Sequence, residues 1–177
     1  MKNICVFSIS YDVGEKYKKA TRELGELIVK NNFNLVWGGT NKGLMKVIAD
    51  SVQSNGGKIF GVTMEALKKN RRMNADEMII TKNISERKKT LLSKSDSFVL
   101  LSGGIGGLDE TTEILELKKE KLHNKPIIFL NTDNFYGGLK ILFKRMKKDG
   151  FIEENLDDLI FFADTPQKAI NYIKSYK

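Results

Sequence analysis

The stretch SFVLLSGGIGGLDETTE, residues 97–113, most constrains the fold of this chain. Its apolar run at 98–101 is typical of a strand buried on both faces, and the run stops at a glycine-rich segment, 102–107. A helix is expected next, with Asp109, Glu110 and Glu113 in its first turns. A strand, a glycine loop and a helix N-terminus form a phosphate-binding arrangement, because the loop's N–H groups approach an anion closely and the helix dipole favours negative charge. The acidic residues either face solvent as partners of the dipole or act chemically beside the phosphate.

Strands alternate with helices along the whole chain. The apolar patterns predict strands at 3–7, 33–37, 58–62, 78–81, 98–101, 126–130 and 159–162. They predict helices at 14–30, from 44 to the Asn-Gly-Gly stop at 55–57, at 84–94, after the central glycines, at 136–148 and at 165–176. We therefore expect one Rossmann-like domain over residues 1–177, an α/β fold with a doubly wound, mainly parallel sheet and helices on both faces.

The sequence shows no sign of a membrane partner. No apolar run approaches the length of a membrane span, and the start MKNICVFSIS is a charged residue followed by a short strand rather than a signal peptide. We expect a cytoplasmic protein. Cys5, the one cysteine, stands in an apolar strand and is expected in the core rather than as a nucleophile.

The formal net charge of +8 raises the question of nucleic-acid binding. The basic residues are 25 lysines and five arginines, scattered through predicted helices without interleaved aromatic residues. Nucleic-acid readers favour the planar fork of arginine. The pattern favours a solvated lysine surface, and we expect no nucleic-acid partner.

Several distant segments should meet at one edge of the sheet. In open parallel sheets the ligand site lies beyond the carboxyl ends of the strands, and segments 8–10, 38–43, 84–88 and 102–110 all follow strands. This rule brings Arg87, two glycine loops and Glu110 around one cleft. Arg71 and Arg72, in segment 65–77, either form a lid over an anion or belong to an exposed loop, which is the reading we favour.

Several familiar motifs are absent. A Walker loop needs Lys-Ser/Thr after its last glycine, but Gly43 is followed by Leu-Met, and the central glycines lack the third position of the dinucleotide fingerprint. His123 is the single histidine and there is no Cys/His cluster, so we expect no metal. The features of a pyridoxal enzyme are missing too, and we expect no cofactor.

The motifs GGTNKGLM at 38–45, ERK at 86–88 and SGGIGGLDE at 102–110 resemble, in order and spacing, the signatures of the LOG family of nucleoside 5′-monophosphate phosphoribohydrolases. The resemblance covers nearly the whole chain, including NTD at 131–133 and Tyr136. It implies a Rossmann-like fold, a homodimer, and metal-free hydrolysis of the N-glycosidic bond of a small-molecule nucleotide such as AMP or a cytokinin ribotide.

The resemblance also implies roles for individual residues. Arg87 and Glu110 match the family's catalytic arginine and glutamate. A carboxylate beside the sugar suits an oxocarbenium-like transition state. Lys88 touches either phosphate or solvent. Ser8 is a candidate for a supporting position behind the site, and Glu113 is either such a supporting hydrogen-bonding partner or a surface charge. Glycines are expected to bind the substrate and its phosphate, namely Gly38, Gly39, Gly43, Gly103, Gly104, Gly106 and Gly107.

The chain departs from the family pattern at several positions near the expected site. Ser102 and Gly107 replace the proline and threonine of Pro-Gly-Gly-x-Gly-Thr, while Ile9, Thr40 and Lys46 replace glycines. We expect altered substrate choice or weaker phosphate binding rather than a new fold. The alternative is a non-catalytic nucleotide or molybdenum-cofactor carrier on the same fold. Such a carrier would need neither the arginine nor the glutamate, so their joint presence favours the enzyme.

Overall fold

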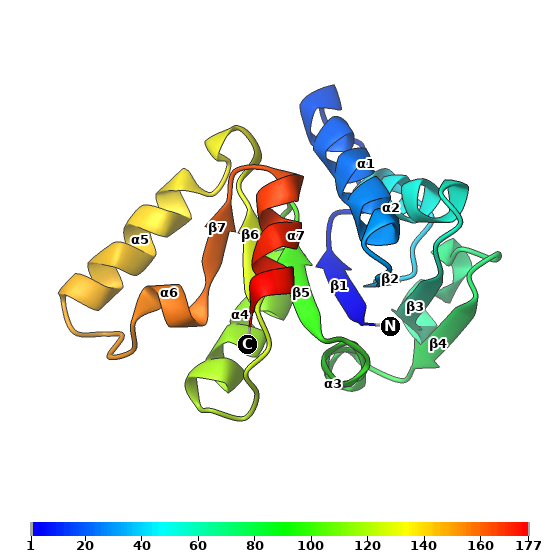
Figure 1. Ribbon diagram of the computed structural model, residues 1–177. Helices are drawn as coiled ribbons and strands as arrows, with labels where there is room; N and C mark the ends of the chain where they lie inside the picture. Colours follow the sequence, from blue (N-terminus) through cyan, green and yellow to red (C-terminus); the bar gives the residue numbers. More distant parts are fainter. Residues whose placement is uncertain (1, 177) are drawn as a thin grey trace.

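The computed structural model describes residues 2–176, and its centre is one seven-stranded sheet in the order β4-β3-β2-β1-β5-β6-β7 (Figure 1). Every neighbouring pair of strands is parallel, which confirms the doubly wound prediction. The strands are β1 (Asn3–Phe7), β2 (Asn34–Trp37), β3 (Ile59–Met64), β4 (Glu77–Thr81), β5 (Ser97–Leu100), β6 (Ile127–Leu130) and β7 (Phe161–Ala163).

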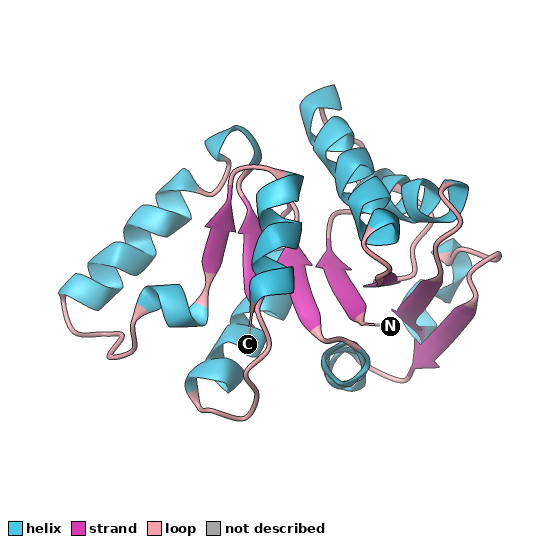
Figure 2. Ribbon diagram, in the orientation of Figure 1, coloured by secondary structure: helices cyan, strands magenta, loops and turns pink. Residues whose placement is uncertain are grey.

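Helices cover both faces of this sheet (Figure 2). The α-helices are α1 (Glu15–Lys30), α2 (Gly43–Ser54), α3 (Ile84–Lys94), α4 (Ile105–Lys119), α5 (Gly137–Lys148), α6 (Leu156–Leu159) and α7 (Pro166–Ser175), and the 3-10 helices are η1 (Glu65–Asn70) and η2 (Thr132–Asn134). Helices α1, α2 and α7 pack on one face, while α3, α4, α5 and α6 pack on the other.

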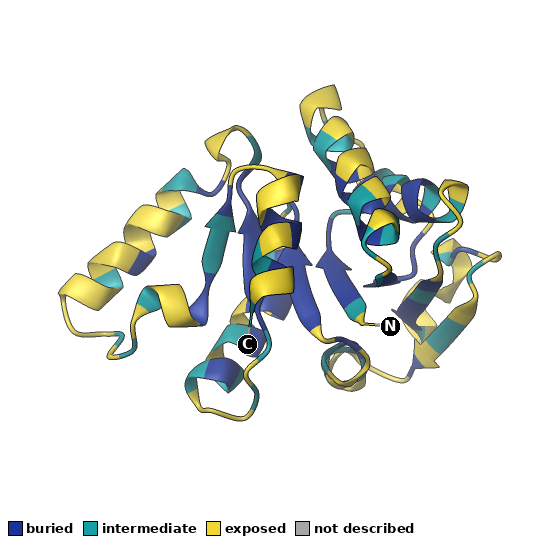
Figure 3. Cartoon of the chain, in the orientation of Figure 1, coloured by how far each residue is buried: buried dark blue, intermediate teal, exposed yellow. Residues whose placement is uncertain are grey.

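The core divides into two layers because successive strand residues point to opposite faces. In β1, Ile4 and Val6 contribute to the layer under α1, α2 and α7, whereas Cys5 and Phe7 contribute to the opposite layer. The central strands β1, β2, β5 and β6 are mostly buried, the edge strands β4 and β7 are less so, and the outer sides of the helices are exposed (Figure 3). Cys5 is therefore a buried core thiol, as predicted.

The direction in which strands are added to the sheet reverses at β1. After β4 it returns through α3 to β5, which pairs with β1 on the side opposite to β2. This reversal opens a crevice at the carboxyl ends of β1 and β5, where ligands bind in sheets of this kind.

Three predictions differ most from the structure. The central helix begins at Ile105, so Gly106 and Gly107 lie in its first turn rather than in a loop. The stretch predicted as the last strand, 159–162, is divided between the short α6 and β7. Segment 65–77 holds the 3-10 helix η1, but Arg72, two residues after the end of η1, is 8% exposed and does not belong to an exposed loop.

Candidate functional site

A cavity of about 560 Å³ lies beyond the carboxyl ends of the central strands. Five segments that are distant in the sequence line it, as the topology predicts. They are Ser8–Tyr11 after β1, the start of α2 with the segment before it (Gly38, Thr40, Lys42 and Met45), Leu67 and Asn70 of η1, Ile84 and Arg87 of α3, and the start of α4 (Gly104–Gly107, Asp109 and Glu110).

Arg87 and Glu110 form a buried ion pair in this cavity. Arg87 comes from α3 and Glu110 from α4, and their side chains are 8% and 9% exposed. Arg87 Nη1 donates to Glu110 Oε1, and Arg87 Nε donates to the Val62 carbonyl oxygen at 3.0 Å. Two donors of the guanidinium are thus fixed, so the carboxylate is held in one orientation.

Gly38 makes room for this pair. A Cβ at position 38 would lie 2.6 Å from Arg87 Nη2 and 3.1 Å from the Met45 methyl group. A larger residue would therefore push the guanidinium away from its position beside Glu110. The sequence suggests that the glycines at 38 and 39 bind a phosphate. The structure gives a steric reason for glycine at position 38, because a side chain there would displace Arg87.

Burial raises the pKa of the Glu110 carboxyl, and the positive charge of Arg87 together with its hydrogen bond opposes that shift. A carboxylate whose pKa lies above its ordinary value is a stronger base than an exposed glutamate. It can therefore accept a proton from water more readily.

The start of α4 presents free backbone donors to the cavity. Gly104 is the N-cap, Gly104–Gly107 line the cavity, and no side chain caps this helix end. The first N–H groups of a helix have no partner within the helix, and the positive end of the dipole lies there. An anion such as a phosphate fits this end of the cavity.

The structure places the other predicted glycines behind the cavity lining. The Gly39 carbonyl oxygen accepts a hydrogen bond from the Arg72 N–H. Gly43 begins α2 with φ +54°, against the backbone of Ser10 and Tyr11. Gly103 lies between β5 and the N-cap of α4 and is half-buried.

Lys88 and Glu113 pair with each other beside the cavity. Lys88 Nζ lies 2.7 Å from Glu113 Oε2 and 2.7 Å from Asp109 Oδ2. Burial lowers the pKa of Lys88, but its hydrogen bonds to these two carboxylates outweigh burial and raise it. The structure thus brings Lys88 to the carboxylates of α4, whereas the sequence offered phosphate or solvent.

Ser8 lies in the cavity wall with a buried hydroxyl. Within residues 2–176 its Oγ has no hydrogen-bond partner, and the same holds for Ser102 Oγ. Ile9, Thr40 and Gly107, which depart from the family pattern, all line the cavity. The departures therefore change the wall that would face a ligand.

The sequence reasoning missed the apolar rim of the cavity. Its members share high exposure, although they are large and apolar: Tyr11 73%, Leu67 39%, Ile84 45% and Ile105 86%. The sequence signals these rim residues through their positions: Tyr11 and Ile84 follow strands β1 and β4, and Ile105 stands between the central glycines. An apolar rim suits the flat faces of a base.

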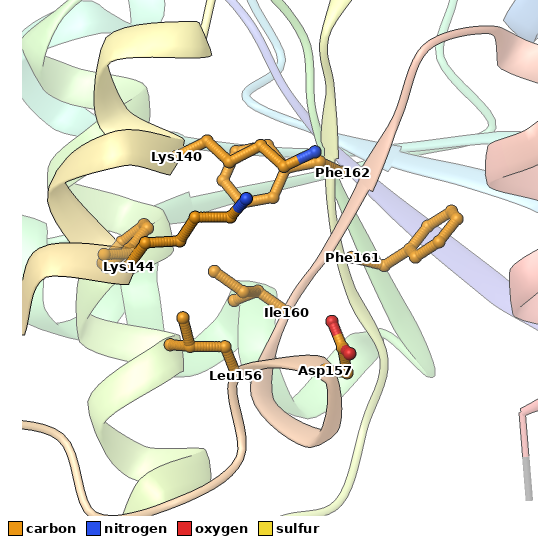
Figure 4. A pocket seen from close by; sticks show the side chains of 8 residues that line it. Lys140, Lys144, Leu156, Asp157, Ile160, Phe161 and Phe162 are labelled. Atoms are coloured by element: carbon orange, nitrogen blue, oxygen red, sulfur yellow. The ribbon is translucent and has the colours of Figure 1, made fainter. Parts of the chain in front are cut away.

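A second, smaller hollow of about 140 Å³ lies at the edge of the sheet, between α5, α6 and β7 (Figure 4). Lys140 and Lys144 extend from α5 over its apolar floor, and Lys140 Nζ lies 5.6 Å from the centre of the Phe162 ring. No glycine loop reaches it, and its lining contains none of the predicted site residues.

Residues 2–176 contain neither a membrane-spanning helix nor a cluster of metal-ligating side chains. None of the helices there combines the length and apolar character that crossing a bilayer demands. No group of three or more histidine, cysteine, aspartate or glutamate side chains there is arranged to hold a metal ion.

Comparison with known proteins gives one family and one group of folds. Residues 45–173 match the family model described as "Possible lysine decarboxylase". Two cytokinin riboside 5′-monophosphate phosphoribohydrolases of Arabidopsis thaliana are similar over nearly the whole chain. LOG1 is 31% identical over 99% of this chain and 84% of its own length, and LOG5 is 30% identical over 99% and 78%.

Solved structures share the fold at lower identity. The molybdenum cofactor binding protein of Rippkaea orientalis has a TM-score of 0.78 at 24% identity, covering 98% of this chain and 96% of its own. The molybdenum cofactor carrier protein of Chlamydomonas reinhardtii has a TM-score of 0.75 at 20% identity, covering 99% and 97%. At these identities the likeness establishes the Rossmann-like fold.

Proposed function

Since this chain belongs to the family of the "Possible lysine decarboxylase" model, the LOG family, we propose that it hydrolyses the N-glycosidic bond of a nucleoside 5′-monophosphate. The products are the free base and ribose 5-phosphate, and an AMP-like nucleotide or a cytokinin ribotide is the expected substrate. The family relationship supports a hydrolase at the level of the family, and the residues of the cavity support the particular reaction.

One observation carries the proposal: the Arg87–Glu110 ion pair is buried in a cavity that also contains the N-terminus of α4. A phosphate bound to the free N–H groups of α4 would leave the sugar of the nucleotide within the same cavity as Glu110. Binding energy from the phosphate, which does not react, can then hold the sugar in position.

The chain's own groups suit each part of the hydrolysis. As the bond between C1′ and the base nitrogen breaks, the base leaves with the electron pair and positive charge develops on the sugar. The Glu110 carboxylate stabilises that charge, orients a water molecule and accepts its proton while the water oxygen bonds to C1′. Arg87 holds the carboxylate in place. The departing base takes up a proton from solvent, and Glu110 then releases to solvent the proton that it accepted.

The test is a base-release assay with AMP, GMP, CMP, UMP, IMP and isopentenyl-adenosine monophosphate, analysed by chromatography. Wild type is compared with Glu110→Gln, Arg87→Ala and the matched control Glu116→Gln, which changes an exposed carboxylate of the same helix outside the cavity lining. We expect base and ribose 5-phosphate from the wild type and the control, and a rate loss of roughly 10²-fold or more in the other two variants.

Two results would count against the proposal. Equal activity of Glu110→Gln and Glu116→Gln would show that the Glu110 carboxylate takes no part in the chemistry. Failure of wild type to release a base from any of the six nucleotides, together with nucleotide-dependent thermal stabilisation, would favour the non-catalytic carrier.

A further inference from the structure

Arg72 is buried among polar groups of two other segments of the chain. Its Nη1 donates to Asp50 Oδ1 at 2.6 Å and to Asn41 Oδ1 at 3.0 Å, and its Nε donates to Gln53 Oε1 at 2.8 Å. Asp50 and Gln53 belong to α2, while Asn41 follows the glycine pair after β2. One guanidinium therefore joins helix α2, the glycine segment and the chain that follows η1.

The main chain around Arg72 makes a second set of bonds to the same glycine segment. The Arg72 N–H donates to the Gly39 carbonyl oxygen at 2.8 Å, and the Asn41 N–H donates to the Asn70 carbonyl oxygen at 2.9 Å. Between them, Thr40 and Arg71 form an antiparallel bridge. The segment after η1 thus runs beside the glycine segment as a short two-stranded ladder.

This ladder forms one wall of the cavity. Thr40 on one side of it and Asn70 on the other both line the cavity, whereas Arg72 stands behind them and does not. Moving either segment would move a lining residue. Neither the lid nor the exposed loop predicted from the sequence describes this arrangement.

We propose that Arg72 is a positioning residue, which holds the cavity wall of Thr40 and Asn70 against α2 and so sets the geometry in which a nucleotide binds. The role in nucleotide binding rests on the proposed function, while the hold on the wall does not. The planar fork is essential to this role, because a lysine can pair with Asp50 but cannot also reach Gln53 and Asn41 in fixed directions.

The experiment compares wild type with Arg72→Met, Arg72→Lys and the matched control Ser51→Ala. Ser51 also belongs to α2, but its Oγ donates to the Arg22 carbonyl oxygen at 2.7 Å, on the side facing α1 and away from the cavity lining. The control therefore weakens the anchoring of α2 without touching the Arg72 contacts. Each variant is studied well below its unfolding midpoint.

Two readouts are used. The first is amide hydrogen exchange at residues 41 and 72, whose N–H groups are bonded in the ladder. The second is kcat/KM for the nucleotide that the wild type hydrolyses, or Kd for AMP by calorimetry if no hydrolysis is found. A misplaced cavity wall should lower kcat/KM, or weaken AMP binding, on the order of 10- to 100-fold.

We expect Arg72→Met to accelerate hydrogen exchange at both amides and to lower kcat/KM, or weaken AMP binding, by that factor. Arg72→Lys should fall between Arg72→Met and wild type, and Ser51→Ala should match wild type in both readouts. Equal kcat/KM or Kd in Arg72→Met and Ser51→Ala, with unchanged exchange at residues 41 and 72, would overturn the proposal. If the wild type neither binds nor hydrolyses a nucleotide, the proposed function fails, and the exchange data alone decide whether Arg72 holds the wall.

Discussion

Replacing Gly43 by alanine tests whether the second glycine segment serves the cavity by steric fit. Gly43 has φ +54°, and a Cβ there would lie 2.3 Å from the Tyr11 carbonyl oxygen and 2.4 Å from the carbonyl carbon of Ser10. Both contacts are to backbone, so no side chain can rotate away to relieve them. Ser10 and Tyr11 line the cavity, and the loop that must move is therefore part of the site.

The cost of this substitution has two parts. The left-handed backbone costs a residue with a Cβ about 1–2 kcal/mol relative to glycine. Inserting a methyl group into filled space costs typically about 1–3 kcal/mol more. We expect Gly43→Ala to lower the free energy of unfolding by about 2–5 kcal/mol, which for a chain of this size lowers Tm on the order of 10 °C.

The control is Gly56→Ala, because Gly56 has φ +79° and a Cβ there would meet no atom within 4 Å. It carries the backbone cost alone, about 1–2 kcal/mol. Urea unfolding is followed by the fluorescence of Trp37, the single tryptophan, which is fully buried in β2. If Gly43→Ala costs no more than Gly56→Ala, the Ser10–Tyr11 loop yields freely and the steric argument is wrong.

Three further outcomes are expected. Burial raises the pKa of Glu110, and the proposed activity needs its carboxylate form. On acidification kcat should therefore begin to fall at a pH above the ordinary glutamate range, as pH passes through the raised pKa. A pH–rate profile with an ordinary glutamate pKa would contradict this. Tyr136→Phe removes the 2.7 Å hydrogen bond from the Tyr136 hydroxyl to the Leu101 carbonyl oxygen and should cost about 1–2 kcal/mol in urea unfolding, whereas an unchanged midpoint would show that the bond contributes nothing. Lys88→Ala should leave KM unchanged, because the ammonium pairs with two carboxylates of α4, and a tenfold rise in KM would instead place Lys88 on the phosphate.

Much of the fold could be predicted because hydrophobic periodicity is a local property. The strand Asn3–Phe7 and the helix Ile84–Lys94 have the predicted bounds. The start of α4 at Ile105 could not be read in the same way, because its first turn contains two glycines. Glycine disfavours helix locally, and packing of the helix on β5 overrides that preference.

The site could be predicted in outline for a topological reason. The carboxyl ends of parallel strands lie at one edge of the sheet, and this rule alone predicts that Arg87 and Glu110 lie in one cleft. No such rule predicts which residues a long polar side chain will contact. Arg72 pairs with Asp50 and Lys88 with Asp109, each about 20 residues away in sequence, and no local pattern signals either contact.

The burial of the Arg87–Glu110 pair is itself an argument for a catalytic role rather than that of a non-catalytic carrier. Taking two charges out of water costs several kcal/mol per ion, and an apolar pair of similar volume would stabilise a core at least as well. The pair stands in the lining of a cavity rather than within either packed layer, and Gly38 lacks the side chain that would displace the guanidinium. Stability alone therefore does not account for it. The proposed hydrolysis does account for it, since a fixed carboxylate in a poorly solvated site interacts with positive charge developing on the sugar far more strongly than one in water.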